Sequence, residues 1–333
     1  MKFTLIICTY QRPLPLLKLL QSVHLQSVYP DEILIVDGST NEDTKSILTK
    51  NAFQNLKYFL VSYNDRGLTK QRNFGIKKVA SSSEIVCFLD DDTVLEHNYF
   101  EEILKTYAKH QNALGVGGYI INENSWTFVG NNYKPALKEF YYDGWKIKEG
   151  SRFVLRKLLG LDSNQPPGYS SGYSHGRSVG FLPPSDKTYM VEQLMGGVSS
   201  FKKEVFDTFQ FSTYFEGYGL YEDADFTLRV SKKGQLYINT AAKLNHYHDP
   251  AGRPNQYQYG KMVVRNGWYV WRIKNPNPSI IDKLKWNCIT ILLTFIRFSN
   301  VFAKSKSKEA FTEALGRTVS WWSLWFDRPK TNN

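Results

Sequence analysis

The chain has 333 residues, of which 42% are apolar and 22% are charged, and it contains only 3 cysteines. This composition is typical of a globular core and excludes a disordered or collagen-like chain. The cysteines are too few and too scattered for a disulfide framework or a cysteine metal site, and they fit a reducing compartment. At roughly 150 residues per domain, the length allows about two domains, or one large domain with an appendage.

The net charge of +11 is concentrated near the C-terminal end of the sequence. Residues 261–333 contain 13 Lys and Arg against 4 Asp and Glu, a net charge of +9, which leaves only +2 for the first 260 residues. Six of the 8 tryptophans also lie in this segment. The basicity therefore belongs to one segment rather than to the whole chain, and we expect no nucleic-acid partner.

Neither a secretory signal nor a membrane-spanning helix is visible in the sequence. The apolar run at 3–8 is too short for the hydrophobic region of a signal peptide. The longest charge-free run of the tail, 286–296, has 11 residues, whereas a spanning helix needs about 20. We therefore expect a cytoplasmic chain that lies on a membrane surface without crossing the bilayer.

The first 90 residues alternate between strand and helix patterns. Buried strands are expected at 3–8, 33–36, 58–61 and 84–89, and helices at 14–26, 41–50 and 69–80. This alternation predicts an α/β fold. We expect a doubly wound, mainly parallel sheet with helices on both faces and with ligands at the carboxyl ends of its strands.

The pattern changes beyond residue 122. Residues 122–185 are rich in Gly, Ser, Pro and Tyr, which predicts long loops. Regular structure is expected again at 190–201, in a helix at 222–232, in an extended stretch at 236–244 and in the helices of the tail. We therefore predict a catalytic domain at 1–255 and a basic, Trp-rich, amphipathic helical region at 256–333.

Three consecutive acids, Asp90, Asp91 and Asp92, follow the predicted strand at 84–89. Such closely spaced charges repel one another unless a cation sits among them. Carboxylates suit Mg²⁺ or Mn²⁺, which can in turn hold a diphosphate, although a solvated acidic turn is the alternative. Asp37 follows another strand in the same way, so these acids should lie along one edge of the sheet.

Basic and amide side chains lie near the start of the predicted helix at 69–80. Arg66, Lys70, Arg72 and Asn73 could meet phosphate oxygens at that edge, or they could form a solvated basic face.

Glu222 and Asp223 begin another predicted helix. Two close acids can supply a general base because each raises the pKa of the other, although helix capping would also explain them. His246 and His248 alternate on an extended segment, so their side chains should point to the same side. Either histidine could complete a metal site or remain on the surface.

In their order along the chain, these motifs resemble family 2 glycosyltransferases of the GT-A fold. The resemblance covers about residues 1–250 and is carried by seven segments: 4–10, 35–40, 72–76, 88–92, 195–197, 215–216 and 221–234. It implies an inverting transferase that moves a sugar from a nucleotide-diphospho-sugar, most simply a UDP-sugar, to a hydroxyl group. The implied acceptor is a glycan or a lipid-linked molecule in the synthesis of cell-surface polysaccharide or glycolipid.

The same resemblance implies roles for individual residues. Asp223 matches the catalytic base, with Glu222 beside it. Asp90 and Asp92 match the family's ligands of Mn²⁺ or Mg²⁺, and His246 matches a histidine often found after its last strand; His248 is a further candidate ligand from its spacing. By the same resemblance Thr9, Tyr10, Arg12 and Asp37 would hold the base and ribose of the donor. Arg72, Asn73 and Asp91 are further candidates for donor binding. Gly38 stands where the family often has a second acid, which leaves the identity of the nucleotide open.

The basic tail predicts amphipathic helices. A narrow polar stripe comprises Lys283, Asn287, Thr290, Thr294, Arg297 and Lys304, and a later apolar stripe comprises Phe311, Leu315, Val319, Trp322 and Phe326. Basic residues that flank Trp-rich apolar helices suit an anionic bilayer. We therefore expect residues 280–330 to contact the cytoplasmic face of the inner membrane. A helical cap on the catalytic domain, or a dimer, would cover the same apolar side chains.

Two other function classes remain as alternatives. A nucleotidyltransferase would share the metal and the nucleotide fold, but no Gly-rich basic loop follows the first strand. A non-catalytic module that binds membranes or nucleic acid would use the basic tail. The intact acids Asp37, Asp90–Asp92 and Asp223 argue against a degenerate site.

Overall fold

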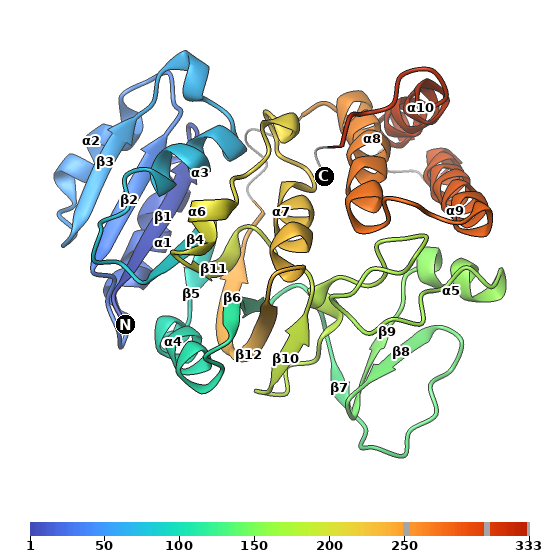
Figure 1. The fold of residues 1–333 in the computed structure, drawn as a ribbon, viewed down its shortest axis with the longest axis horizontal. Coiled ribbons are helices and arrows are strands. Elements are labelled where there is room, and N and C mark those ends of the chain that lie inside the picture. The colour runs from blue at the N-terminus through green and yellow to red at the C-terminus, as the bar shows by residue number, and fades with distance from the viewer. Residues whose placement is uncertain (249–253, 303–306, 332–333) are drawn as a thin grey trace. The chain divides into compact units, whose positions relative to one another are not determined.

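The computed structural model describes residues 1–248, 254–302 and 307–331, which form two compact units (Figure 1). Unit 1 comprises Met1–Ser125 and Val179–Gly252, and unit 2 comprises Trp126–Ser178 and Arg253–Asn333. Residues 126–178 therefore group with the C-terminal segment in space. The boundary at 255/256 stays a prediction about functional domains.

Unit 1 is built on one sheet, which has nine strands in the described residues. Eight of them lie in the order β10-β12-β6-β11-β4-β1-β2-β3, and β5 pairs with β12. The strands are β1 (Phe3–Thr9), β2 (Glu32–Asp37), β3 (Leu56–Leu60), β4 (Ile85–Asp90), β5 (Thr93–Leu95), β6 (Ala113–Ile120), β10 (Thr188–Val191), β11 (Val198–Lys202) and β12 (Gln235–His246).

The sheet is parallel where the sequence predicts it and mixed beyond that point. Strands β3, β2, β1 and β4 are parallel neighbours. Strand β11 runs antiparallel between β4 and β6, and both β5 and β10 run antiparallel to β12. The expected α/β class is confirmed, and the antiparallel strands complete a mixed sheet.

Helices cover the sheet of unit 1 because its central strands are apolar on both faces. The helices are α1 (Pro13–His24), α2 (Asp43–Lys50), α3 (Leu68–Ile76), α4 (Tyr99–Lys109), α6 (Val205–Thr208) and α7 (Glu222–Ser231), with short 3₁₀ turns η1 (Tyr63–Asp65), η2 (Val179–Phe181) and η3 (Thr213–Phe215). Every residue of β2 is buried. Helix α1 has a proline in its first turn and buries Leu16, Leu19 and Leu20 in the core.

The strand register brings the ends of β1, β2 and β4 to one edge of the sheet. Thr9 pairs with Asp37, and Cys8 pairs with Asp90. The predicted common edge for the acids after the two strands is therefore confirmed. We call this edge the acid edge; it comprises the carboxyl ends of β1, β2, β4 and β12 and the residues that directly follow them.

Unit 2 contains a small antiparallel sheet that the sequence analysis did not predict. Its strands are β7 (Thr127–Phe128), β8 (Glu139–Tyr142) and β9 (Trp145–Lys148), and helix α5 (Ser151–Leu158) follows them. The prediction of loops throughout 122–185 is therefore wrong for these residues. Asp143 and Gly144 join β8 to β9 with φ angles of 48° and 83°, as in the two-residue turn of a tight hairpin.

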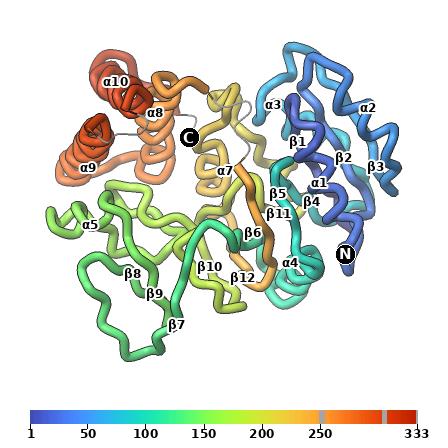
Figure 2. The backbone as a smooth tube through the Cα atoms, turned by 180° about the vertical axis from the view of Figure 1, so that it is seen from behind, coloured from blue at the N-terminus to red at the C-terminus, as the bar shows by residue number. Residues whose placement is uncertain are grey.

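The C-terminal part of unit 2 is helical, as predicted, and comprises α8 (Gln256–Lys274), α9 (Ile280–Ser299), the 3₁₀ turn η4 (Asn300–Phe302) and α10 (Ser307–Ser323). Figure 2 shows these helices gathered in one group. A Cβ atom on Gly260 would collide with the backbone of Glu313, and one on Gly316 would collide with the backbone of Tyr257. Helices α8 and α10 therefore cross in direct backbone contact, which glycine alone permits. No helix among the residues described has the length and hydropathy to cross a membrane.

Candidate functional site

The acid edge contains a group of side chains that can hold a cation. Asp90 ends β4, Asp92 lies in the turn after it, and His246 ends β12. One ligand atom from each of these residues lies within 4.8 Å of the other two. Two carboxylates fit Mn²⁺ or Mg²⁺, and the imidazole favours a transition metal over Mg²⁺. The donor set therefore fits the expected metal.

His246 is held among carboxylates. Its Nε2 atom lies 3.0 Å from Oδ1 of Asp92, and its Nδ1 atom lies 3.6 Å from Oε1 of Glu123. Burial alone would lower the pKa of His246, but interactions with Asp92, Glu123 and Asp90 raise it to about 10. The surrounding carboxylates therefore favour the protonated ring, and a metal ion bound at Nε2 would take the place of one of its two protons.

His248 lies beside this group but makes a different contact. Its ring centroid is 4.0 Å from that of His246, as expected for two histidines on one side of the segment. Its Nε2 atom lies 2.8 Å from Oε1 of Glu123. The cation group formed by Asp90, Asp92 and His246 does not include His248.

Asp91 and Arg12 connect the end of β1 to the acidic turn. Arg12 lies 3.0 Å from Asp91 and 3.6 Å from Asp92, and the hydroxyl of Thr9 donates a hydrogen bond of 2.7 Å to Asp91. Burial raises the pKa of Asp91 to about 7 although Arg12 and Thr9 oppose the shift. Thr9, Arg12 and Asp91 therefore form one network.

Asp37 and Tyr10 differ sharply in exposure. Asp37 is fully buried, and its carboxylate accepts hydrogen bonds from the Tyr58 hydroxyl at 2.9 Å and from the Ser39 amide at 2.8 Å. Tyr10 is exposed. The role of both residues in holding a nucleotide stays a prediction.

Arg72 lies next to the acid edge, near Asp90. Its guanidinium is buried, forms an ion pair with Glu222 and lies 3.6 Å from Oδ1 of Asp90. The rings of Phe88 and Phe211 cover it at 5.8 Å and 5.2 Å. Arg72 therefore links a candidate metal ligand to the acid pair of α7.

Asn73 holds the backbone of Phe211, whose ring packs against Arg72. Its side-chain amide donates to the backbone oxygen of Phe211 at 2.8 Å and accepts from the Phe211 amide at 3.0 Å. The contacts of Arg72 and Asn73 in this structure are with the protein itself, and their predicted part in donor binding stays a prediction.

The acid pair at the start of α7 has one buried and one half-buried member. Glu222 is buried; burial raises its pKa to about 8 against the charge of Arg72, and Asp223 adds to the rise. Asp223 accepts hydrogen bonds from the amides of Gly196 at 3.1 Å and Ala224 at 2.8 Å, and burial raises its pKa as well. Because Asp223 is the less buried acid, it is the better placed to meet a substrate.

Two consecutive glycines allow these acids to approach one another. A Cβ atom on Gly197 would overlap the carboxylate of Asp90, and one on Gly196 would overlap Glu222 and Arg72. The backbone oxygen of Gly197 also accepts a hydrogen bond from the Asp90 amide at 3.0 Å. The close approach of Asp90, Glu222 and Arg72 to these two positions explains why both are glycine.

The N-terminal segment of the chain also matches a known protein family. Residues 4–159 match the model of glycosyl transferase family 2. This segment belongs to that family. The fold agrees, because a crystal structure of GalNAc-T7 with UDP, GalNAc and Mn²⁺ superposes with a TM-score of 0.53 at 15% identity over 90% of this chain and 57% of that chain. The expected GT-A fold is thus confirmed.

Curated relatives of this family 2 domain act on sugars. The chain is 26% identical over 147 residues to a glucosyl-dolichyl phosphate glucuronosyltransferase of Haloferax volcanii, which covers 43% of this chain and 44% of that protein. It is 31% identical over 113 residues to a UDP-Gal:alpha-D-GlcNAc-diphosphoundecaprenol beta-1,3-galactosyltransferase of Escherichia coli, which covers 33% and 40%. The matched segments span less than half the length of both relatives.

The structure adds residues to the site that the sequence patterns did not single out. Glu123 contacts both histidines, Tyr58 binds Asp37, and Phe211 covers Arg72. No local pattern marks these residues, because each meets its partner through the fold of the chain.

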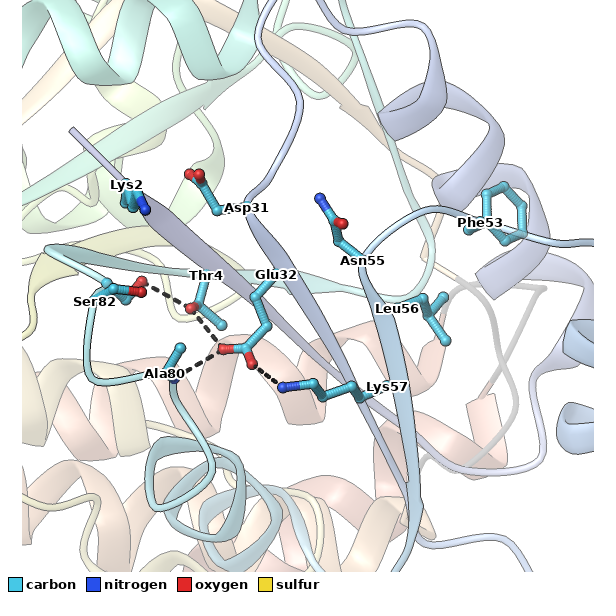
Figure 3. Close-up of a pocket in the computed structure, with 11 residues that line it drawn as sticks. Lys2, Thr4, Asp31, Glu32, Phe53, Asn55, Leu56, Lys57, Ala80 and Ser82 are labelled. Carbon is cyan, nitrogen blue, oxygen red and sulfur yellow. Dashed lines mark hydrogen bonds and ion pairs between the residues drawn. The ribbon is translucent and has the colours of Figure 1, made fainter.

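A hollow of about 350 Å³ lies at the opposite edge of the sheet of unit 1 (Figure 3). The buried carboxylate of Glu32, at the start of β2, accepts from Lys57 at 2.8 Å, Thr4 at 2.9 Å and the Ala80 amide at 3.0 Å. Burial opposes these donors, but together they lower the pKa of Glu32. This fully satisfied acid is suited to stability rather than to chemistry.

Proposed function

We propose that the chain is a metal-dependent, inverting glycosyltransferase that moves a sugar from a nucleotide-diphospho-sugar to a hydroxyl of a glycan or lipid-linked acceptor. One observation carries the proposal. A candidate general base, Asp223, and a candidate metal group, Asp90, Asp92 and His246, meet at one edge of a family 2 domain, where Gly196 and Gly197 separate them.

The chemistry requires a base because a hydroxyl group is a weak nucleophile near neutral pH. The acceptor oxygen bonds to the anomeric carbon while the bond from that carbon to the diphosphate oxygen breaks. The proton of the hydroxyl passes to the carboxylate of Asp223, and the electron pair of the broken bond leaves with the diphosphate. The raised pKa of Asp223 suits a proton acceptor.

The remaining residues bind and orient the donor. Asp90, Asp92 and His246 would hold Mn²⁺ or Mg²⁺, which supplies positive charge to offset the charge of the leaving diphosphate. Arg72, which pairs with Glu222, lies 3.6 Å from Asp90 and would help to orient it. Tyr10 and Arg12, just after β1, would contact the nucleotide together with Asp37. Asp91, which also accepts from Thr9, holds Arg12 in place.

A UDP-sugar is the donor that we propose, and a lipid-linked glycan is the acceptor. The name of the Escherichia coli relative specifies UDP-Gal and a diphosphoundecaprenol acceptor, and the superposed crystal structure contains UDP and Mn²⁺. Synthesis of cell-surface polysaccharide or glycolipid follows as the proposed process.

The experiment that tests this function is product analysis with a panel of nucleotide sugars and Mn²⁺. Release of free nucleoside diphosphate, whether to water or to an added acceptor, is the expected result. Release of pyrophosphate would instead support the nucleotidyltransferase alternative. A protein that binds vesicles but neither binds nor cleaves any nucleotide sugar would support the non-catalytic alternative.

We also propose that unit 2 contacts an anionic membrane, because its helices α9 and α10 expose large apolar side chains. Two members of the polar stripe of α9 contact α10: Asn287 accepts from the Trp321 indole at 2.8 Å, and Arg297 pairs with Glu313 at 2.6 Å. Lys283 of the same stripe is exposed, and the buried side chains of α9 are Trp286 and Ile289. Lys304, the last member of that stripe, lies outside the described residues.

The exposed face of α9 and α10 is apolar. Its members, exposed by 39% or more, are Ile281, Leu284, Ile291, Phe295, Phe311, Leu315, Val319 and Trp322. Those on α9 are spaced by steps of three, seven and four, which is one face of a helix. Exposure of such an apolar face to water is unfavourable. An anionic bilayer would match both this apolar surface and the net charge of +9 in 261–333. A peripheral position at the cytoplasmic face of the inner membrane follows.

Flotation with anionic liposomes tests this contact. Phe295→Ser together with Trp322→Ser should lower the bound fraction severalfold, whereas Leu158→Ser, an exposed apolar residue on α5, should leave it unchanged. Binding should weaken at high salt because exposed charges are screened. Equal flotation of the double variant and the wild type would contradict the proposal. A wild-type protein that forms dimers through this face and does not bind vesicles would contradict it as well.

A further inference from the structure

Asn122, in the loop after β6, fixes the backbone of His246. Its side-chain amide donates to the His246 carbonyl at 2.9 Å, and its side-chain oxygen accepts from the His246 amide at 3.0 Å. Strands β6 and β12 are parallel neighbours whose register pairs Ile120 with Leu244. The loop after β6 is therefore held beside the end of β12, where His246 lies.

Glu123, the next residue, faces the ring of His246. One ring nitrogen, Nε2, lies 3.0 Å from Asp92, and the other, Nδ1, lies 3.6 Å from Glu123. The carboxylate of Glu123 is itself held by Nε2 of His248 at 2.8 Å. The ring of His246 is thus placed between two carboxylates that belong to different loops.

The two carboxylates differ in what lies next to them. Asp92 belongs to the group with Asp90, which directs Nε2 of His246 toward the candidate metal position. A histidine that binds a metal through one nitrogen commonly donates the N–H of its other nitrogen to a carboxylate, which fixes the ring and strengthens the ligand. Glu123 is the carboxylate available to Nδ1.

We propose that Glu123 is a positioning residue of the metal site, which acts by holding Nδ1–H of His246 so that Nε2 faces the cation. This inference rests on the proposed metal-dependent function. Glu123, His246 and His248 also form a group within 4.8 Å, and direct ligation by Glu123 is the alternative. The shared His246 favours positioning, because its two nitrogens face the two carboxylates separately.

Mn²⁺ binding to the full chain, measured by electron paramagnetic resonance of the free ion, tests the proposal. Glu123→Gln should weaken Mn²⁺ affinity about 10- to 100-fold relative to wild type. Glu204→Gln changes an exposed glutamate whose ion-pair partner, Lys202, lies 4.0 Å away, and this control should bind like wild type. Asp92→Asn removes a proposed ligand and should abolish tight binding.

Electron spin echo envelope modulation of bound Mn²⁺ distinguishes positioning from ligation. Wild type should show coupling to a histidine nitrogen, and Glu123→Gln should lose or weaken it. Unchanged affinity in Glu123→Gln would overturn the proposal, and so would weakened affinity with full nitrogen coupling, because Glu123 would then act without His246. Wild type that binds no Mn²⁺, or that binds it as tightly after Asp92→Asn, would instead refute the metal site of the proposed function.

Discussion

Carboxylates are buried at both edges of the sheet in unit 1, but their pKa values are shifted in opposite directions once their partners are included. At the opposite edge, where β1, β2 and β4 begin and which we call the amino-end edge, Glu32 has a cation and two neutral donors, and its pKa is lowered. At the acid edge and in the adjoining first turn of α7, the pKa values of Asp91, Glu222 and Asp223 are all raised by burial. The first arrangement stabilises the folded chain, whereas the second keeps acids in a state that protonation or a cation can change.

The difference shows which feature sets the proposed site apart from the rest of the sheet. Burial of an acid is common to both edges and therefore does not distinguish them. The distinguishing feature is a surplus of acids over cations: Asp90, Asp91, Asp92, Glu222 and Asp223 lie near Arg12, Arg72 and His246. Such a surplus is costly in a folded protein and is relieved by a metal ion or a proton. The hollow beside Glu32 lacks that surplus.

Replacement of the proposed base should have the largest effect at the acid edge. Asp223→Asn should lower turnover by about 100- to 10,000-fold, roughly 3–5 kcal/mol of barrier, because no carboxylate then remains to take the proton from the hydroxyl of the sugar acceptor. Nucleotide binding by calorimetry should be preserved. The control Asp207→Asn, an exposed acid in α6, should keep full turnover. Near-normal transfer by Asp223→Asn would rule out its assignment as the base.

Crowding the acid edge should have the next largest effect. Gly197→Ala should lower turnover about 100-fold and weaken Mn²⁺ binding, because the new Cβ would displace the Asp90 carboxylate. Gly150→Ala is the matched control, since nothing lies within 4 Å of its Cβ position. Steady-state kinetics and Mn²⁺ titration measure both effects. Wild-type values for Gly197→Ala would show that Asp90 does not need its present position.

A change at the amino-end edge should affect stability and leave catalysis intact. Glu32→Gln should lower the free energy of unfolding by about 1–3 kcal/mol at pH 7, because a charged acceptor of three hydrogen bonds is lost. The folded pKa of Glu32 lies below its ordinary value of 4.5, so its contribution is full above that value and is lost as the pH falls through the folded pKa.

Urea denaturation at pH 7 and in acid measures this effect. The exposed Glu42→Gln serves as the control and should change little. A loss of turnover in Glu32→Gln at unchanged stability would contradict the contrast between the two edges.

The smallest effect should follow from the partner of Glu32. The side chain of Lys57 is 61% exposed, so solvent screens its ion pair, and Lys57→Met should cost about 0.5–1 kcal/mol with no change in turnover. The same denaturation experiment measures it. A loss larger than that of Glu32→Gln would show that the lysine, rather than the two neutral donors, dominates at this edge.

The sequence predicts much of the first half of unit 1 because its signals are local. Buried runs mark β1, β2 and β4, and their parallel order brings Asp37 and Asp90–Asp92 to one edge. The helical spacing of Asp225 and Arg229 predicts their ion pair, which is present at 2.7 Å. The hairpin of unit 2 carries the Asp143-Gly144 turn signal, which the composition of its surroundings obscures.

Other features depend on contacts between distant segments and leave no local trace. Asn122 meets His246 across 124 residues, and the crossing of α8 and α10 depends on the approach of Gly260 and Gly316. The contacts of Asn287 and Arg297 on α9 depend on Trp321 and Glu313 of α10. Periodicity identifies a polar face but not the surface that this face contacts.

The central claim is that the acid edge, and not the amino-end edge, binds a metal ion with a nucleotide. Mn²⁺ titration in the presence of UDP, measured on wild type, Asp92→Asn and Glu32→Gln, tests it most directly. We predict that wild type and Glu32→Gln bind Mn²⁺ equally well and that Asp92→Asn loses the site. Equal binding by wild type and Asp92→Asn, or a comparable loss in Glu32→Gln, would contradict the claim.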